Sequence, residues 1–165
     1  MAKESILVIL FLIPIFTFGQ KYRLENEQIL FEFKTQNNKR LTIAKDKSDK
    51  YLVYRYGTEN KIEFEYPNEK LNSWKKFKFS NYLRGGGKAN EGMDLSYLYF
   101  QVENNKYVVY AEYLAQTGKT NYGIKVINLK NDKTTTIKAN HNSIIGTLSV
   151  FRDNKKIEKG EELFM

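Results

Sequence analysis

The chain has 165 residues, a formal net charge of +8 and no cysteine. The absence of cysteine excludes disulfide bonds, a thiol nucleophile and a lipid anchor attached to a cysteine. The fold must therefore depend on a buried core, and a chain of this length is long enough to form one.

The first element of the chain is an almost wholly apolar segment at residues 6–18. Thr17 and Gly19 follow it as small residues at the spacing that a signal peptidase recognises. The segment of about thirteen residues is shorter than the roughly 20 that a membrane-spanning helix needs, which is the alternative interpretation. We therefore predict a secretory signal peptide over residues 1–19 and cleavage before Gln20.

Residues 20–165 are predicted to form a single all-β domain without a membrane span. The chain has 12 Tyr and 11 Phe but only 2 Pro, a composition that suits pleated sheet. Apolar residues alternate with polar ones in "ILFEFKT", "KIEFEYP" and "WKKFKFS". This period of two is typical of strands with one buried face. Polar turn signals occur at 36–39, 103–106, 117–120, 130–133 and 152–155.

These turns separate about ten predicted strands, the last of them at residues 144–151. Most strands would pair with their sequence neighbours, which gives an antiparallel meander closed into a small barrel or folded into a two-sheet sandwich. In the first strand the alternation places Ile29, Phe31 and Phe33 on one face. The predicted core includes Ile62, Phe64, Phe77, Phe79, Leu98, Val108, Ile124, Val126 and Leu148.

The residue types of enzyme active sites are scarce in this sequence. The single histidine, His141, lies in a polar turn, where a solvated surface residue is the usual case. Glu63 and Glu65 form a carboxylate pair of the kind that glycosidases use, but they alternate with apolar residues as on a solvated strand face. A second pair, Glu161 and Glu162, lies in a charged tail. We assign no catalytic residue, no metal ligand and no cofactor.

One candidate contact surface is the tyrosine-rich stretch "YLVYRYGTENKIEFEYP", which begins at Tyr51. Tyr54, Arg55 and Tyr56 could form an aromatic and cationic surface for a sugar or a peptide, because tyrosine combines apolar area with a hydroxyl group. The alternative is a core strand in which some of these side chains point inward.

The second candidate is the loop "LRGGGKANEGMD" at residues 83–94. Gly85, Gly86 and Gly87 can adopt backbone conformations in which successive N–H groups converge on an anion. Arg84 and Lys88 would supply charge beside them. The alternative is a structural loop in which the backbone passes close to another element. We expect this loop on the surface at one end of the β domain.

The stretches "YRYGTENKIEFEYP", "YLRGGG", "NEGMDLSYLYF" and "KGEEL" resemble a group of uncharacterised small exported bacterial β-proteins. This resemblance implies no activity and no site residues. The tyrosine-rich strand and the glycine turn are also distantly similar to the periplasmic inhibitors of C-type lysozyme. The Ser-Gly-x-x-Tyr loop of those inhibitors and their cysteines are absent here, and the basic charge does not suit C-type lysozymes, which are usually basic themselves.

The sequence therefore predicts an exported protein, periplasmic or secreted, that acts as a non-catalytic binding module of the bacterial envelope. The charge of +8 favours an anionic glycan or an acidic protein as the partner, and we expect no nucleic acid. The same charge is also explained by solubility alone. The alternative function is an envelope glycan hydrolase that acts through paired carboxylates.

Overall fold

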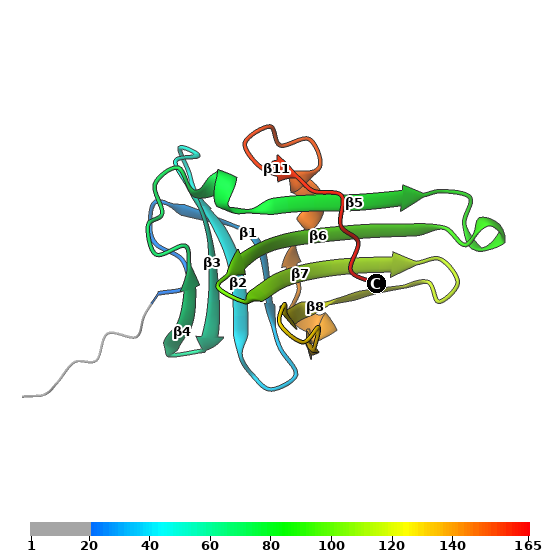
Figure 1. Ribbon diagram of the computed structural model, residues 1–165, viewed down its shortest axis with the longest axis horizontal. Helices are drawn as coiled ribbons and strands as arrows, with labels where there is room; N and C mark the ends of the chain where they lie inside the picture. Colours follow the sequence, from blue (N-terminus) through cyan, green and yellow to red (C-terminus); the bar gives the residue numbers. More distant parts are fainter. Residues whose placement is uncertain (1–20) are drawn as a thin grey trace, which may run out of the picture.

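The structure is a computed structural model that describes residues 21–165, which form two β-sheets packed together (Figure 1). The predicted all-β class is confirmed, and the arrangement is sandwich-like rather than a closed barrel. The predicted signal peptide, residues 1–19, lies outside the described residues. Within the described part of the chain, no helix has the length and apolar character needed to cross a bilayer.

The first sheet consists of a meander of four consecutive strands and of a short strand from later in the chain that pairs with the first of them. Its members, in spatial order, are β10 (Ile145–Gly146), β1 (Glu27–Lys34), β2 (Arg40–Asp46), β3 (Leu52–Thr58) and β4 (Lys61–Tyr66). All its neighbouring strands are antiparallel. A bulge between Ile29 and Phe31 places Phe31 and Phe33 in the core and leaves Ile29 half-buried.

The second sheet is longer and extends beyond the first at one end (Figure 1). Its order is β11 (Glu158–Lys159), β5 (Lys78–Arg84), β6 (Met93–Val102), β7 (Asn105–Leu114), β8 (Lys119–Asn128) and β9 (Thr134–Lys138). The strands β5 to β9 form a second antiparallel meander, and β11 joins β5 in parallel. A 3-10 helix, η1 (Ser73–Lys76), leads from the first sheet into β5.

The turns occur where the polar signals predict them. Asn38, Glu103 and Asp132 have positive φ angles of 60°, 51° and 55° at the turns after β1, β6 and β8. Gly118 has a φ of 64° at the turn after β7. Asn, Asp and glycine tolerate this left-handed region, so at Asn38, Gly118 and Asp132 the local sequence determines where the meanders reverse direction.

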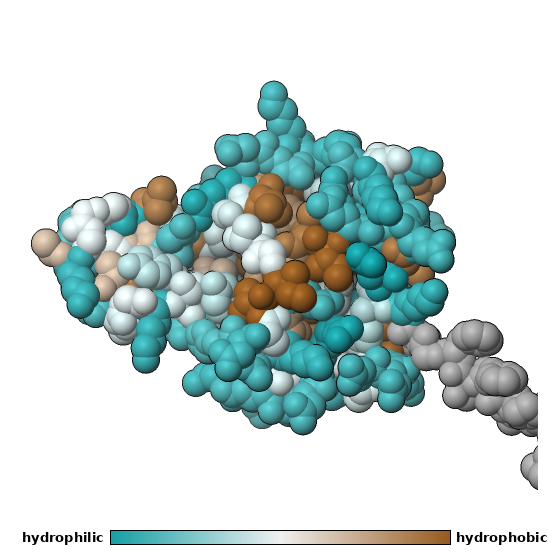
Figure 2. Space-filling view, turned by 180° about the vertical axis from the view of Figure 1, so that it is seen from behind, coloured by the Kyte–Doolittle hydropathy of each residue, from teal (hydrophilic) through white to brown (hydrophobic). Residues whose placement is uncertain are grey.

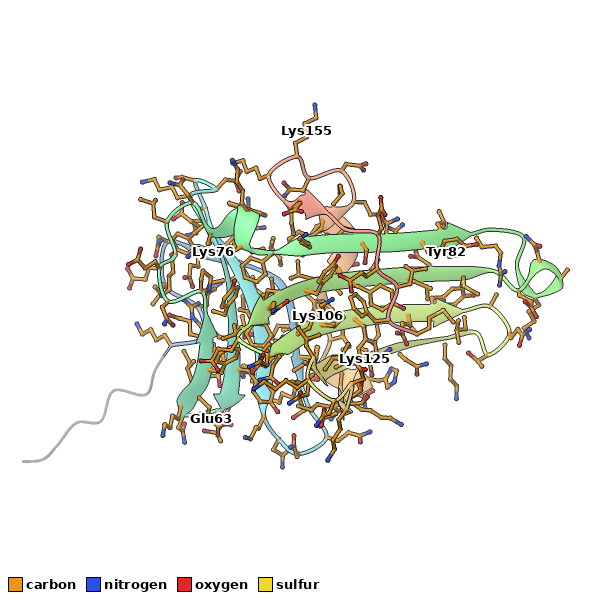
Figure 3. The ribbon with its side chains drawn as sticks, viewed as in Figure 1. Glu63, Lys76, Tyr82, Lys106, Lys125 and Lys155 are labelled. Atoms are coloured by element: carbon orange, nitrogen blue, oxygen red, sulfur yellow. The ribbon has the colours of Figure 1, made fainter. Side chains whose placement is uncertain are left out.

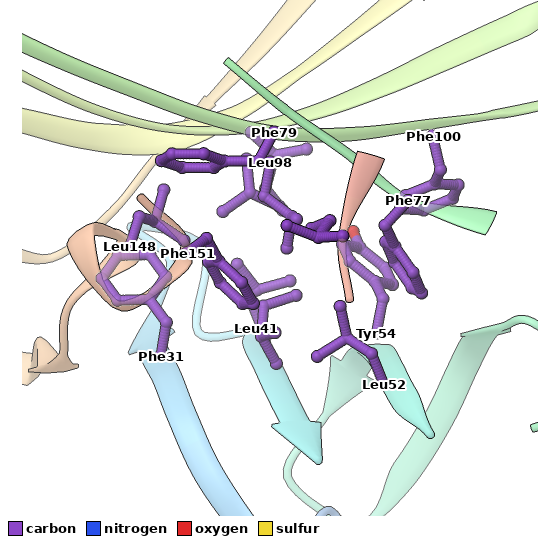
Figure 4. Packing of buried hydrophobic residues seen from close by; sticks show 14 of the residues in the cluster. Phe31, Leu41, Leu52, Tyr54, Phe77, Phe79, Leu98, Phe100, Leu148 and Phe151 are labelled. Atoms are coloured by element: carbon purple, nitrogen blue, oxygen red, sulfur yellow. The ribbon is translucent and has the colours of Figure 1, made fainter. Parts of the chain in front are cut away.

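The larger of two apolar clusters lies between the sheets and draws residues from both (Figure 4). Phe31 and Leu41 come from the first sheet, and Phe79 and Leu98 from the second. Of the predicted core, Val108 is buried in the other cluster, on the outer face of the second sheet, and Ile62 is only partly buried. The other predicted residues lie in the main cluster or pack against it: Phe64, Phe77, Phe79, Leu98, Ile124, Val126 and Leu148.

The predicted strand at residues 144–151 is wrong. Only Ile145 and Gly146 pair as a strand, and Leu148–Phe151 form the 3-10 helix η4. Gly146 has a φ of 74°, which breaks the extended backbone, and the side chain of Thr147 caps the helix by accepting a hydrogen bond from the amide of Ser149. Leu148 and Phe151 then reach the core from one helical face, because residues three apart align in a 3-10 helix.

Each terminal segment covers the outer face of one sheet. Near the N-terminus, Tyr22 is buried, and its hydroxyl donates hydrogen bonds to the carbonyls of Thr58 and Lys61 over the first sheet. At the C-terminus, residues 160–165 cross the second sheet, where Phe164 packs against the outer apolar cluster (Figure 1). Seen from behind, the rest of the surface is mostly hydrophilic around one apolar patch (Figure 2).

Candidate functional site

The expected exposed surface at Tyr54, Arg55 and Tyr56 is not formed. Tyr54 and Arg55 are each 1% exposed, and Tyr56 is half-buried. Tyr54 points into the main core, with its ring 5.1 Å from that of Phe100. Arg55 lies on the opposite face of the same strand, where the N-terminal segment covers it. The interpretation as an outward-facing contact site is therefore wrong for Tyr54 and Arg55.

Arg55 instead forms a buried ion pair with Glu27. Its Nη1 and Nη2 atoms donate to the two carboxylate oxygens of Glu27 at 2.6 and 2.8 Å. Its Nε donates to Glu65 at 2.5 Å, and Nη1 also donates to the carbonyl of Tyr22 at 2.9 Å. Such a two-pronged arrangement is the strongest geometry for an arginine and a carboxylate. It joins β1, β3 and β4 to the N-terminal segment.

The pKa of Glu27 reflects this environment. Burial alone would raise the pKa of Glu27, but hydrogen bonds from Arg55 and from the backbone amide of Leu24 outweigh burial. The pKa is consequently held below its ordinary value of 4.5. Glu27 and Arg55 are thus a structural pair and not a binding site.

The glycine-rich loop lies on the surface at the far end of β5 and β6, as predicted (Figure 1). Gly85, Gly86, Gly87 and Lys88 are exposed. The loop contains one turn of 3-10 helix, η2 (Lys88–Asn90), and the side chain of Asn90 donates to the carbonyl of Gly85 at 2.9 Å.

Arg84 is engaged within this loop. Its Nε and Nη2 atoms donate to the carbonyl of Glu91 at 3.0 and 2.7 Å, and Nη2 lies 3.5 Å from the Glu91 carboxylate. A pocket of about 190 Å³ adjoins these residues, and apolar atoms make up most of its lining. Arg84 therefore closes the loop in this structure, and Lys88, the other cation of the loop, is exposed and forms no ion pair with a described residue. A contact with a partner at this loop stays a prediction.

The first carboxylate pair of the alternative function, Glu63 and Glu65, is bound to cations. Glu63 pairs with Lys39 at 2.5 Å, and Glu65 pairs with both Arg55 and Lys70. Across the described residues, no group of three or more acidic or histidine side chains could hold a metal ion. His141 is exposed, with its ring 5.9 Å from that of Tyr122.

The structure brings together a site that the sequence did not single out. A pocket of about 280 Å³ lies where the strands β6 and β7 meet the segment that enters β5, and we call it the lysine pocket. Register pairs Lys78 with Tyr99 and Gln101 with Lys106, which brings these four residues to one end of the sheet. The lining of the lysine pocket consists of Tyr66, Lys75, Lys76, Lys78, Tyr99, Phe100, Gln101, Lys106 and Glu162.

Aromatic rings form part of the wall of the lysine pocket. The ring of Tyr66 stacks on that of Phe100, with centroids 4.1 Å apart and planes at 7°. The hydroxyl of Tyr66 donates to the carbonyl of Lys76 at 3.4 Å, which ties the wall to the basic segment. Stacked aromatic rings are rigid, so they present a fixed apolar surface beside the ammonium groups.

Two of the four pocket lysines are paired with acids from the end of the chain. Lys78 lies 2.8 Å from Glu158, whose hydrogen bond raises the pKa of Lys78, and Lys106 pairs with Glu162. Lys75 and Lys76, by contrast, have no ion pair with any described residue. These two exposed ammonium groups are therefore available to an anion from solution.

A second, wider pocket of about 600 Å³ adjoins the first and shares Lys75 with it. It adds Lys50, Lys155 and Lys156 around Asn72, Asp49 and Trp74. Lys156 lies 3.3 Å from Asp49, whereas Lys50 and Lys155 form no ion pair with any described residue. Lys50 also interacts electrostatically with Asp46 at longer range. Lys76, Lys106 and Lys155 lie well away from Tyr82 and the glycine-rich end (Figure 3). We call the four unpaired residues Lys50, Lys75, Lys76 and Lys155 the lysine surface.

The sequence contains only part of the signal for this site. The stretch "WKKFK" shows three lysines close together, and Lys76 and Lys78 do lie on the solvent side opposite Phe77 and Phe79. The contributions of Lys50, Lys106 and Lys155 depend on chain topology, because they are separated from this stretch by long segments.

Comparison with known proteins gives no relative of this chain: no family model matches it, and neither the curated proteins nor the solved structures contain a significant match.

Proposed function

We propose that this chain is an exported, non-catalytic binding module of the bacterial envelope that contacts an anionic glycan through the lysine surface. The observation that carries the proposal is the lysine surface itself: four exposed ammonium groups that form no ion pair in the described chain, around two adjoining pockets, one with an aromatic wall. Carboxylate or phosphate groups of a polymer would pair with the lysines, and a sugar ring would lie against the half-buried Tyr66.

The size of the lysine pocket indicates what it would hold. Small-molecule sites commonly have volumes of about 300–1,000 Å³, so a pocket of about 280 Å³ suits one unit of a longer polymer rather than a large free ligand. Because the wider pocket shares Lys75, successive units could occupy both.

Binding is tested with polygalacturonate as the anionic glycan and dextran as the neutral one. The variant Lys75→Ala/Lys76→Ala/Lys155→Ala should bind polygalacturonate about tenfold more weakly, because three exposed ion pairs contribute roughly 0.5 kcal/mol each. Added salt should weaken wild-type binding by screening. Dissociation constants are measured by isothermal titration calorimetry.

Two further variants make the result specific. Lys119→Ala/Lys130→Ala/Lys133→Ala removes the same charge from exposed turns and should leave binding nearly unchanged. Arg84→Ala/Lys88→Ala tests the glycine-rich loop, for which loss of the arginine should cost about 1.5–3 kcal/mol if the loop makes the contact. Equal weakening by the surface variant and the turn variant would leave only general charge attraction and contradict the proposed site.

Export belongs to the same proposal and is supported by the apolar segment at residues 6–18. A mature chain that starts at Gln20 would keep Tyr22 and every other described residue. We expect the mass of the protein recovered from the envelope or the medium to correspond to residues 20–165. Recovery of a chain that still begins at Met1 would contradict cleavage.

A further inference from the structure

The last six residues, 160–165, which we call the tail, cross the outer face of the second sheet (red in Figure 1). The amide of Gly160 donates to the carbonyl of Phe79 at 2.9 Å, and the hydroxyl of Ser80 donates to the carbonyl of Glu162. Among the described residues, no later amide of the tail takes part in a backbone–backbone hydrogen bond. A segment with so few main-chain bonds is easily displaced.

Side chains at alternate positions hold the tail. The carboxylate of Glu162 pairs with Lys106, and two residues later the ring of Phe164 packs edge-on against Tyr97 and Tyr99, at centroid distances of 5.3 and 5.0 Å. Lys125 donates a hydrogen bond to the carbonyl of Phe164. The intervening Leu163 is 46% exposed. The contact of the tail with the sheet therefore depends on Glu162 and on Phe164, which lies two positions later.

The surface under the tail, which we call the tail face, consists of Tyr97, Tyr99 and Tyr110 flanked by Lys106 and Lys125. The tyrosines belong to the outer cluster and not to the core between the sheets. Lys106 lies 5.8 Å from the ring centroid of Tyr99, and Lys125 lies 4.8 Å from that of Tyr110. Rigid tyrosines beside cations are well suited to peptide recognition, because they bury area at low entropic cost.

The tail approaches this face as closely as the backbone permits. A Cβ atom added to Gly160 would lie 1.8 Å from the hydroxyl of Tyr99, so a glycine is needed where the chain passes the tyrosine. The arrangement resembles that of a bound extended peptide, with backbone contacts at its start and side-chain contacts after it.

We propose that the tail face is a docking surface for an extended acidic peptide of another protein, with an aromatic residue two positions after an acidic one, and that the tail occupies this surface until such a peptide displaces it. Charge complementarity supports an acidic partner, since the chain carries a net charge of +8 and Lys106 has the tail's Glu162 as its ion-pair partner, which a displacing peptide would have to replace. Lys125 keeps Glu112 as its own ion-pair partner at 2.8 Å. The inference goes beyond the proposed glycan site, although Tyr99, Lys106 and Glu162 line the lysine pocket as well.

The test uses the fluorescently labelled peptide Gly-Glu-Glu-Leu-Phe-Met and the full chain. The variant Glu162→Gln/Phe164→Ala weakens the tail and should bind the peptide about tenfold more tightly than the wild type, in which the tail competes. A peptide of the same composition in the order Phe-Glu-Gly-Leu-Met-Glu is the matched control. It should bind the variant at least about tenfold more weakly, because it loses the spacing of acid and ring.

A second measurement covers the case in which the variant does not fold. In the wild type, a methyl NMR signal from Met165 should sharpen when excess matched peptide displaces the tail, and should not respond to the control peptide. Equal binding of the two peptides, no binding of either, or exchange of tails between two copies detected as a dimer would overturn the proposal. The variant Lys75→Ala/Lys76→Ala/Lys155→Ala should keep peptide binding, so failure of the glycan site and failure of the tail face are distinguishable.

Discussion

Replacement of Arg55 by methionine is expected to lower the free energy of unfolding by about 3–5 kcal/mol, because it would leave the carboxylate of Glu27 buried without its counter-charge. Both side chains are almost completely inaccessible, at 1% and 0% exposure. The change also removes the donor to the carbonyl of Tyr22, so the N-terminal segment would lose an attachment to the sheet. The measurement is urea-induced unfolding followed by tyrosine fluorescence.

Two control variants separate the buried pair from the general effect of losing an arginine. Arg23→Met makes the same substitution at an exposed position and should change stability by less than about 0.5 kcal/mol. The double variant Arg55→Met/Glu27→Leu removes both charges and should cost less than the sum of the two single changes. Additive costs would show that the two side chains do not stabilise one another.

The dependence of protein stability on pH is an independent test of the Glu27–Arg55 pair. The pKa of Glu27 is lowered in the folded protein, so its ionised form contributes stability above its ordinary value of 4.5, and that contribution is lost as the pH falls toward the lowered pKa. In the Arg55→Met variant, burial without a counter-charge raises the pKa instead. The difference in stability between wild type and variant should therefore be largest above about pH 5 and narrow toward pH 3.

Truncation of Phe100 to alanine is the second change with a large expected effect, a loss of about 3–5 kcal/mol. Its ring stacks on Tyr66 and on Tyr107, with centroid distances of 4.1 and 5.2 Å, and meets Tyr54 and Phe77 edge-on at 5.1 and 5.4 Å. Removal of the ring leaves a cavity among these aromatic neighbours, each of which loses a packed partner, as Tyr54 and Phe77 beside Phe100 illustrate (Figure 4). Thermal and urea unfolding report the change.

Tyr82 supplies the matched control for Phe100. It is an aromatic residue of β5 that is 40% exposed, and Tyr82→Ala should alter stability by less than about 1 kcal/mol. Phe100→Leu refills most of the cavity and should cost less than the alanine variant. A loss for Phe100→Ala no greater than that for Tyr82→Ala would show that the aromatic cluster does not determine the stability of the fold.

The sequence predicts the meanders well because their pattern is local. Lys76 and Lys78 alternate with Phe77 and Phe79, and the structure exposes the lysines and buries the phenylalanines. The turns follow from residues that tolerate positive φ, such as Asn38. Period two could not decide between a barrel and a sandwich, because that choice depends on whether the consecutive strands β4 and β5 pair, and in the structure they belong to different sheets.

The binding surfaces are harder to predict for a related reason. Alternation assigns Arg55 to the face opposite Tyr54, which is correct, but it cannot show that the N-terminal segment covers that face and supplies Glu27 as its partner. In the same way, the unpaired state of Lys75 depends on where distant acidic residues lie. Charge counts in the sequence give the sign of the surface potential but not which charges are already neutralised.

The short strands β10 and β11 pair with β1 and β5, and this affects the order in which the fold can be completed. A chain that grows from its N-terminus can form both meanders from local contacts, since β1–β4 and β5–β9 are each continuous in sequence. The outer edges of β1 and β5 stay open until β10 and β11 have been synthesised. Open strand edges are templates for aggregation, so a chain interrupted after β9 would expose at β1 and β5 the positions that β10 and β11 otherwise cover with two residue pairs each.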